Sequence, residues 1–178
     1  DDVLSIMLAN VRMPEQNWGD LKAQIASMNT GERKVHDMIA KFGIETFKEG
    51  IAALLDYAED QARAIVRDLP DGQYAFADYM DEDVAEGYPC RIALNVTIDG
   101  DSLVFDLTGS DPQIEGSVNM PTGGEVRHAL MMVGLVYGLY SLDKKLFLNS
   151  GISRVCRCIL PTGTIVNPEF PAAVGLRT

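Results

Sequence analysis

The chain has 178 residues, of which 47% are hydrophobic and 23% are charged, and its formal net charge is -11 with a sequence pI near 4.5. A domain takes roughly 100 to 200 residues, so this is a soluble globular composition with one good core or two small ones. The acidic balance and the lack of any Lys/Arg cluster argue against a nucleic-acid-binding face, because phosphate binding requires a basic patch.

Neither end of the chain carries a targeting or capping pattern. The N-terminus lacks an initiator Met, a charged segment and a small-residue cleavage site, so we expect no signal peptide. The longest apolar run covers 128–142, which is short of the roughly 20 residues that span a bilayer. We therefore expect a cytoplasmic protein without a membrane segment, and we interpret the sequence as an internal piece of a longer chain.

Cysteine and histidine are sparse. Cys90, Cys156 and Cys158 are an odd number without framework spacing, which favours a reducing compartment over a disulfide scaffold. The Cys156-x-Cys158 pair could bind a metal, but without a second pair it is more typical of two strand cysteines on one face. Neither His36 nor His128 has another ligand at metal-binding spacing, so we predict no metal site.

The N-terminal region is predicted to be helical after a short apolar opening. That opening ends at Met13-Pro14, because proline removes a backbone donor. Asp20 is a candidate N-cap for a helix over 21–28, Gly31 interrupts the pattern, and Gly43 provides the C-terminal stop.

From Ile44 to Leu69, apolar residues recur every three or four positions, and charged residues fill the opposite face. This period predicts one long amphipathic helix. Glu59 and Arg63 form an i,i+4 pair that contributes about 0.2 to 0.5 kcal/mol. The apolar stripe either packs on its own domain or docks a partner protein.

After Gly72 the period changes from 3.6 to 2, which predicts a strand through Tyr74 and Phe76. The acidic run that follows is interpreted as a solvated loop. Its carboxylates Asp81, Asp83 and Glu86 offer hard oxygen ligands, but the further ligands and central glycine of an EF-hand are missing.

A β-hairpin is predicted around Asp99-Gly100 as a two-residue type I′ turn. In this register Ile98 faces Asp101, and Leu94 faces Phe105. Every apolar side chain then lies on one face and the polar ones on the other, so we expect the register to be strongly specified.

The stretch Phe105 to Pro121 leaves this hairpin as a loop of glycines, prolines and short polar residues. Loops held on a rigid sheet often carry binding and catalytic groups. The register places Asp106 opposite Ala93 and diagonal to Arg91, close enough for an ion pair. An aspartic protease dyad is rejected because Leu107 is inserted in the motif and no second copy exists, and a Gly-x-Ser-x-Gly elbow is absent.

Beyond this loop, residues 125–141 are apolar around almost the full helical circumference, which predicts a helix in a core or a subunit interface. Gly134 and Gly138 would let another backbone approach closely. A strand is predicted over 152–160, and a turn at 161–164 leads to a final extended stretch that completes a last strand pair.

Several short motifs occur in order from one end of the chain to the other. They are Asn10-Val11-Arg12-x-Pro14-Glu15, Gly19-Asp20-Leu21-x-Ala23-Gln24, Leu69-Pro70-Asp71-Gly72-x-Tyr74, Phe105-Asp106-Leu107-Thr108-Gly109-Ser110-x-Pro112-Gln113, Gly116-x-x-Asn119, Asn149-x-Gly151, Pro161-x-Gly163-Thr164-Ile165-x-Asn167-Pro168 and Phe170-Pro171-Ala172. As an ordered set they resemble the hydantoinase B family: the B-type subunits of N-methylhydantoinases, the C-terminal half of 5-oxoprolinases, and subunits of acetone and acetophenone carboxylases. Ser117-Val118 departs from the proline-containing form expected there.

The resemblance implies a segment of a subunit that hydrolyses cyclic amides of the hydantoin or 5-oxoproline type. It implies a hetero-oligomer in which ATP-Mg is held by an A-type partner subunit, and a divalent metal held by the parent protein upstream of this segment. No cofactor is expected in the segment itself, which we expect to be inactive alone. The ketone carboxylase branch of the family stays open as an alternative.

Both reactions require a polarised carbonyl and stabilisation of an oxyanion. On the resemblance we predict catalytic roles for three loop residues and substrate-binding or shape-holding roles for three more. They are Asn119, Ser110 and Thr108, followed by Gly109, Asp106 and Arg12. Alternatively, Ser110 and Asn119 only cap the turn.

The predicted fold class is α+β: one fragment of a larger subunit over 1–178, mainly helical over 1–69, then a mainly antiparallel sheet with one buried helix over 70–178. A second hypothesis is that this piece is a structural and subunit-interface segment, with its long helix and its glycine-containing apolar helix in the contacts while the chemistry lies elsewhere.

Overall fold

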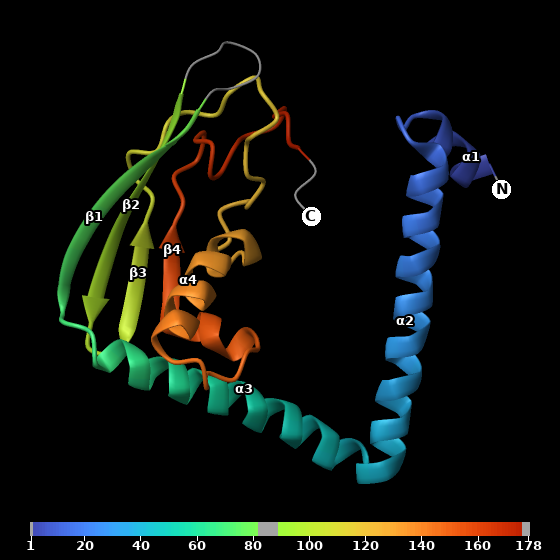
Figure 1. The fold of residues 1–178 in the computed structure, drawn as a ribbon, viewed down its shortest axis with the longest axis horizontal. Coiled ribbons are helices and arrows are strands. Elements are labelled where there is room, and N and C mark those ends of the chain that lie inside the picture. The colour runs from blue at the N-terminus through green and yellow to red at the C-terminus, as the bar shows by residue number, and fades with distance from the viewer. Residues whose placement is uncertain (1, 82–88, 176–178) are drawn as a thin grey trace. The chain divides into compact units, whose positions relative to one another are not determined.

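The computed structural model describes residues 2–81 and 89–175, and the chain divides into two compact units, Asp1–Ala52 and Ala53–Thr178. Helices precede a mostly antiparallel sheet, so the α+β prediction is confirmed (Figure 1). The acidic cluster considered for calcium includes Asp83 and Glu86, which lie outside the described residues.

The first unit contains helices α1 (Asp2–Ala9) and α2 (Pro14–Phe42) and the start of α3. None of residues 2–52 is buried. Helix α2 begins at Pro14, because the fixed φ of proline suits the first helical position and its missing N–H has no partner there in any case. It ends at Gly43, whose φ of +81° turns the chain and whose N–H donates to Ile39 O.

The predicted start and interruption of this helix are wrong. Asp20 lies inside α2 and is not its N-cap, and Gly31 continues the helix instead of breaking it. A glycine in a helix interior costs only about 1 kcal/mol relative to alanine, which a helix of 29 residues tolerates.

Helix α3 (Ile44–Arg67) confirms the long amphipathic helix and ends two residues before the predicted boundary. Its buried face is made of Ala58, Ala62 and Val66, which pack into the core of the second unit. On its other side the predicted pair forms, with Arg63 Nη2 2.7 Å from Glu59 Oε1.

The second unit is built on one four-stranded sheet in the order β1 (Gly72–Met80), β2 (Cys90–Asp99), β3 (Ser102–Asp106) and β4 (Cys156–Ile159). The first three strands are antiparallel, as predicted, while β4 runs parallel to β3. Parallel neighbours require a crossover, and here it contains helix α4 (Ala129–Leu142).

The predicted hairpin register is wrong by two positions. Asp99 pairs with Ser102, so the turn residues are Gly100-Asp101 and not Asp99-Gly100. Only Gly100 has a positive φ, +59°, which matches a turn with glycine at its first central position. Because side chains alternate with period 2, a shift of two residues leaves every side chain on the predicted face.

The end of the chain also differs from the prediction. Residues Ser150–Val155 form a 3₁₀ helix, η1, because the Asn149 side chain accepts a hydrogen bond from Gly151 N and starts a tight turn. Only 156–159 form a strand, and that strand joins the main sheet. Beyond it the described residues contain isolated bridges, so the predicted final strand pair is wrong.

Helix α4 confirms the apolar helix near 125–141. It buries Met132, Leu135 and Leu139 against the sheet and α3, while Val133 and Tyr137 stay exposed on its other side. A second cluster of buried side chains fills the opposite end of the sheet: Cys90, Leu107, Ile165 and Val166. No helix in the described part of the chain combines the length and apolarity of a membrane span.

Candidate functional site

Two loops interlace at the end of the sheet where the family-like motifs of the sequence meet (Figure 1). Residues 107–122 follow β3, and residues 160–175 follow β4. Their backbones are joined by hydrogen bonds from Met120 N to Ile165 O, 2.7 Å, and from Ile165 N to Asp111 O, 3.0 Å. Motifs that are about 50 residues apart in the sequence therefore form one structure.

Asn119 is fully buried, and its side chain joins the two loops by hydrogen bonds to their backbones. Its Oδ1 accepts from Ile114 N at 3.1 Å, and its Nδ2 donates to the carbonyl oxygens of Ile114, Gly116 and Ala173 at 2.8, 3.1 and 2.8 Å. The amide thus has all of its donors engaged by backbone, which is the arrangement of a loop organiser. Its catalytic role stays a prediction.

Ser110 is also buried and bonds to the sheet. Its Oγ accepts from Ala93 N at 3.1 Å and donates to Ala93 O at 3.2 Å. The hydroxyl thereby takes the place of a strand partner for Ala93 beyond the end of β3. Ser110 therefore bonds to the backbone of β2, and both its predicted catalytic role and the turn-capping alternative stay predictions.

Asp106 forms a turn with Thr108. Its Oδ1 accepts from Thr108 N at 2.9 Å, and the hydrogen bonds from the Thr108 hydroxyl and backbone lower the pKa of the Asp106 carboxyl. The predicted ion pair with Arg91 is wrong: the true register places Asp106 opposite Asn95, and Arg91 Nη1 donates to Gly109 O at 2.9 Å.

Gly109 and the neighbouring Thr108 are both exposed and form the tip of the turn that follows β3. The φ of Gly109, +95°, is in the region that favours glycine, and its carbonyl is held by Arg91. Among the residues that the structure describes, no acceptor is placed for the Gly109 N–H. The tip therefore presents a backbone donor on a turn whose Thr108 N–H and Gly109 carbonyl are engaged.

Arg12 belongs to the first compact unit and is exposed. It lies between α1 and α2 and lines a cavity of about 430 Å³ with residues 13–16. Five of the six predicted site residues therefore lie in the second unit, four of them at 106–110 and Asn119 farther along the same loop.

One feature of the site was missed from the sequence. The Gln113 side chain pairs with the backbone of Glu169: Gln113 Nε2 donates to Glu169 O at 3.1 Å, and Glu169 N donates to Gln113 Oε1 at 2.6 Å. Next to this pair, residues 113–115 and 170–173 line a cavity of about 510 Å³. Gln113 and Phe170-Pro171-Ala172 both stand in the matched motifs, but nothing in their spacing indicates that they meet.

Within residues 2–81 and 89–175, no group of three or more His, Cys, Asp or Glu side chains could hold a metal ion. His128 caps α4, with Nδ1 accepting from Leu130 N at 3.3 Å. Cys156 and Cys158 are both buried on one face of β4, as predicted. The hydrogen bond with Cys158 and burial raise the pKa of Cys156, so this thiol stays protonated.

The Hydantoinase B/oxoprolinase family matches residues 1–178. The chain is 35% identical over 182 residues to a candidate B-type D-/L-hydantoinase subunit of Pseudomonas sp. (strain NS671), in a match that covers 96% of this chain and 30% of that protein. It is 31% identical over 177 residues to the beta subunit of the caprolactamase of Pseudomonas jessenii, in a match that covers 97% of this chain and 29% of that protein.

A solved structure is also similar: the crystal structure of the ATP-dependent caprolactamase from Pseudomonas jessenii. It superposes with a TM-score of 0.78 at 30% sequence identity and covers 97% of this chain and 29% of that chain. The chain thus spans about 30% of the length of these relatives. On the match over its full length, the chain belongs to the Hydantoinase B/oxoprolinase family.

Proposed function

We propose that this chain is part of a subunit that hydrolyses cyclic amides of the hydantoin, 5-oxoproline or lactam type. The match of the family to all 178 residues supports this proposal. The names of relatives add to it, since they include a hydantoinase subunit, a caprolactamase subunit and a 5-oxoprolinase of Dictyostelium discoideum.

Opening a cyclic amide requires donors for the oxyanion that develops on the carbonyl oxygen when water adds to the carbon. In our proposal the N–H of Gly109 is one such donor. Gly109 is an exposed residue, and no acceptor is placed for its N–H among the described residues. The groups on either side of this peptide are held, since Asp106 accepts from Thr108 N and Arg91 donates to Gly109 O. This N–H is the observation that carries the site, and Ser110 and Asn119 hold the loop behind it.

The remaining components are assigned to other parts of the assembly. We propose that ATP-Mg is held by an A-type partner subunit in a cytoplasmic hetero-oligomer, and that the divalent metal of the parent protein lies outside this segment. The three buried free thiols agree with a reducing compartment.

The test of this function uses a full-length family subunit that carries this sequence, together with an A-type partner. Turnover is measured on hydantoin, 5-oxoproline and caprolactam, with and without ATP. We expect ring opening of at least one of them. Product only from acetone and bicarbonate would move the protein to the carboxylase branch, and no product from any of these would reject the proposed activity.

The site is tested by Thr108→Val, which removes a hydroxyl bond to Asp106 at the exposed tip. We expect kcat/KM to fall by about tenfold or more, because the Gly109 N–H loses its fixed orientation, while stability changes little. Thr97→Val, which removes a hydroxyl from the same face of the sheet but away from the loop, is the matched control. An effect within twofold for Thr108→Val would reject the role of the tip.

The second candidate function is a structural one at a subunit interface. It is favoured by the exposed apolar side chains Ile51 on α3 and Val133 and Tyr137 on α4. It predicts that the double variant Ile51→Ala/Leu55→Ala disturbs assembly with the partner subunit, as measured by size-exclusion chromatography with light scattering. Normal assembly of that variant would count against it.

A further inference from the structure

On one face of the four-stranded sheet, the side chains are buried at β4 and become progressively more exposed toward β1. Direct strand pairing places Tyr74, Val96, Phe105 and Cys158 in one row on this face. Cys158 is only 3% exposed, Val96 and Phe105 are half-buried, and Tyr74 is 45% exposed. The next aromatic on this face of β1, Phe76, is 70% exposed.

The width of the sheet explains this gradient. Strands lie about 4.8 Å apart, and a helix with its side chains is about 10 Å across, so one helix covers about two strands. Helix α4 packs on the half formed by β3 and β4, where Leu103 and Cys156 join its core cluster. On β2 the same face is buried or half-buried against the two core clusters, so the open part of this face is the edge strand β1, at Tyr74 and Phe76.

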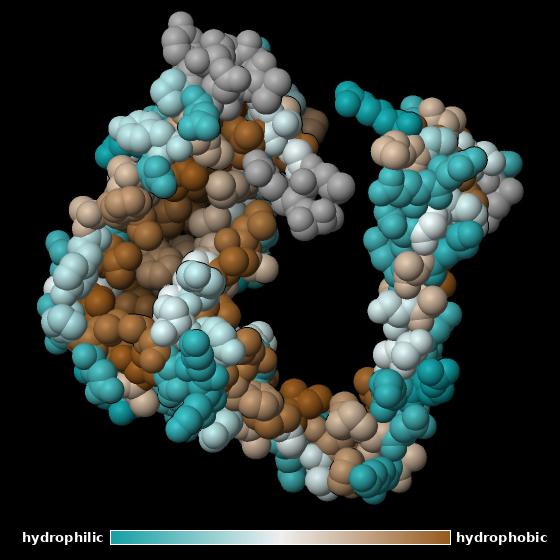
Figure 2. Space-filling model, in the orientation of Figure 1, coloured by the Kyte–Doolittle hydropathy of each residue, from teal (hydrophilic) through white to brown (hydrophobic). Residues whose placement is uncertain are grey.

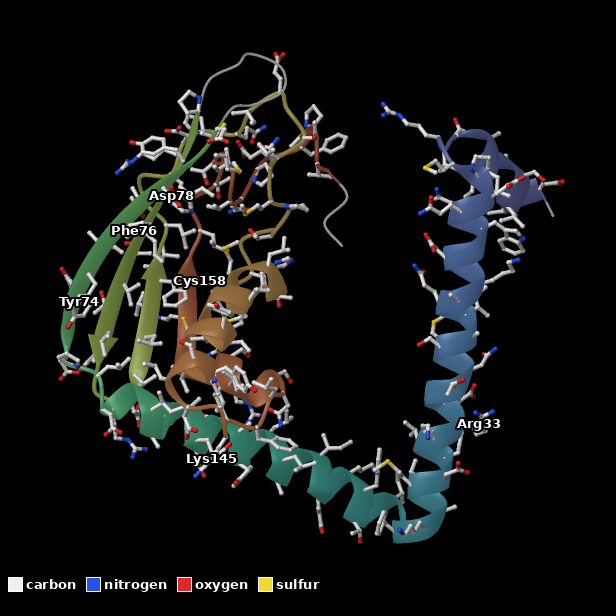
Figure 3. The ribbon with its side chains drawn as sticks, viewed as in Figure 1. Arg33, Tyr74, Phe76, Asp78, Lys145 and Cys158 are labelled. Carbon is white, nitrogen blue, oxygen red and sulfur yellow. The ribbon has the colours of Figure 1, made fainter. Side chains whose placement is uncertain are left out.

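The figures show the same arrangement within the second unit. Figure 2 shows a brown, hollowed surface over the strands, bordered by hydrophilic residues. Figure 3 labels Tyr74 and Phe76 on β1, and Cys158 on the far strand of the sheet beside α4. Asp78, also labelled there, is the only charged residue that β1 and β2 place on this face.

We propose that this open edge, formed by the exposed Tyr74 and Phe76 of β1 beside the half-buried Leu94 and Val96 of β2, binds an amphipathic helix from the part of the family subunit that lies outside this chain. The relatives support this source, because a match over 96% of this chain covers only 30% of a relative's subunit. The helix carries an apolar stripe for the strands and a cationic side chain or its N-terminus opposite Asp78. The inference rests on strand register and exposure and is independent of the reaction proposed above.

The proposal is tested by comparing cysteine reactivity in the 178-residue chain and in a full-length family subunit that carries it. Phe76→Cys places a thiol on the open face, and Ala75→Cys places one on the opposite face of the same strand, where the side chain is also exposed. The three native cysteines are buried, so the maleimide label is located on the new thiol by peptide mass spectrometry.

We expect Phe76→Cys to react at least tenfold more slowly in the full-length subunit than in the 178-residue chain, with a smaller change for Ala75→Cys. Equal reactivity of Phe76→Cys in both proteins would overturn the proposal. So would protection that already exists in the dilute 178-residue chain, or protection that appears as its concentration rises, since the latter identifies a second copy as the cover.

A second variant distinguishes weaker binding of the proposed helix from general misfolding of the chain. Phe76→Asp leaves an exposed side chain exposed in the 178-residue chain, so its Tm should change little there. In the full-length subunit the same carboxylate would be buried under the helix, and we expect Tm to fall by roughly 5 °C or more. Equal changes of Tm in the two proteins would contradict the proposed helix-binding site. Ala75→Asp, on the opposite face of the same strand, is the matched control.

Discussion

Asn119 is a polar residue of a family-like motif whose side chain bonds to four backbone groups. Asn119→Ala would remove the acceptor of Ile114 N and the donors to three carbonyl oxygens. Leaving such buried groups unpaired costs about 1–3 kcal/mol, so we expect a loss of unfolding free energy of that size in the 178-residue chain. Urea denaturation measures it, and unchanged stability would contradict the role of Asn119 in joining the two loops and return it to the group of substrate donors.

Gly151 is a second motif residue with a structural explanation. A Cβ at this position would collide with Leu55 O of α3, and it would also crowd the Asn149 side chain. We expect Gly151→Ala to lower the free energy of unfolding by about 1–3 kcal/mol, because the helix backbone cannot move away without disturbing the core.

The matched control for this variant is Gly134→Ala on α4, where the added methyl meets nothing within 4 Å. Alanine is favoured over glycine inside a helix, so this change should stabilise the chain by up to about 1 kcal/mol. Both values come from the same urea denaturation series. An equal loss in both variants would show that the contact with α3 is not the cause.

At the scale of elements, an ion network joins α3, η1 and the hairpin turn. Glu59 bonds Arg63 at 2.7 Å and Arg154 at 3.2 Å, and Arg63 also bonds Asp101 at 2.9 Å. The Arg63 hydrogen bond is the main cause that lowers the pKa of Glu59 below its ordinary value of 4.5. The stabilisation is therefore complete above pH 4.5 and is lost as the pH falls through the lowered pKa.

Glu59→Gln tests this network. At pH 7 we expect the variant to lose about 0.5–1 kcal/mol of unfolding free energy relative to the parent chain, the size of a partly exposed ion pair. The difference should shrink as the pH falls from 7 through the lowered pKa of Glu59, because the parent then loses this charge as well. Asp60→Asn, an exposed neighbour on the same helix, serves as control. A difference that stays constant over the whole acid titration would exclude the network as its source.

At the scale of the whole molecule, the two compact units differ in how they are stabilised. The second unit has a buried core, whereas none of residues 2–52 is buried. A helix without tertiary packing opens at little cost, since most helix stability in proteins comes from burying an apolar face.

Hydrogen exchange of the 178-residue chain measures this difference. We expect the amides of α2 to exchange at least about 100-fold faster than those of β3, because α2 opens without loss of buried surface. Equal protection of the two elements would show that α2 is packed in solution. The exposed apolar side chains of α2 include Ile25, Met28 and Met38.

Local patterns predicted the elements better than their ends and connections. The 3.6 period of α3 and the period of 2 around Asp99 identified the right structures, because each pattern reports a face that must be buried. The predicted position of the turn is wrong because Asp99-Gly100 and Gly100-Asp101 can both form a two-residue hairpin turn, and both place the strand side chains on the same faces of the sheet. The strand predicted over 152–160 is confirmed only over 156–159. Residues 152–155 belong to η1, because the Asn149 cap and its contact with α3, which residue periodicity does not report, turn the chain there.

The sequence by itself determined the family, the α+β class, the amphipathic and apolar helices and the two faces of the hairpin, since these depend on motifs and on residue periodicity within short segments. Only the tertiary structure decided which groups the loop side chains bond to. Asn119 and Ser110 have the chemistry of substrate donors, but their partners are backbone groups brought close by the fold. The exposure of Gly109 and of the apolar side chains of β1 likewise depends on which neighbours are present in space, and sequence spacing does not report it.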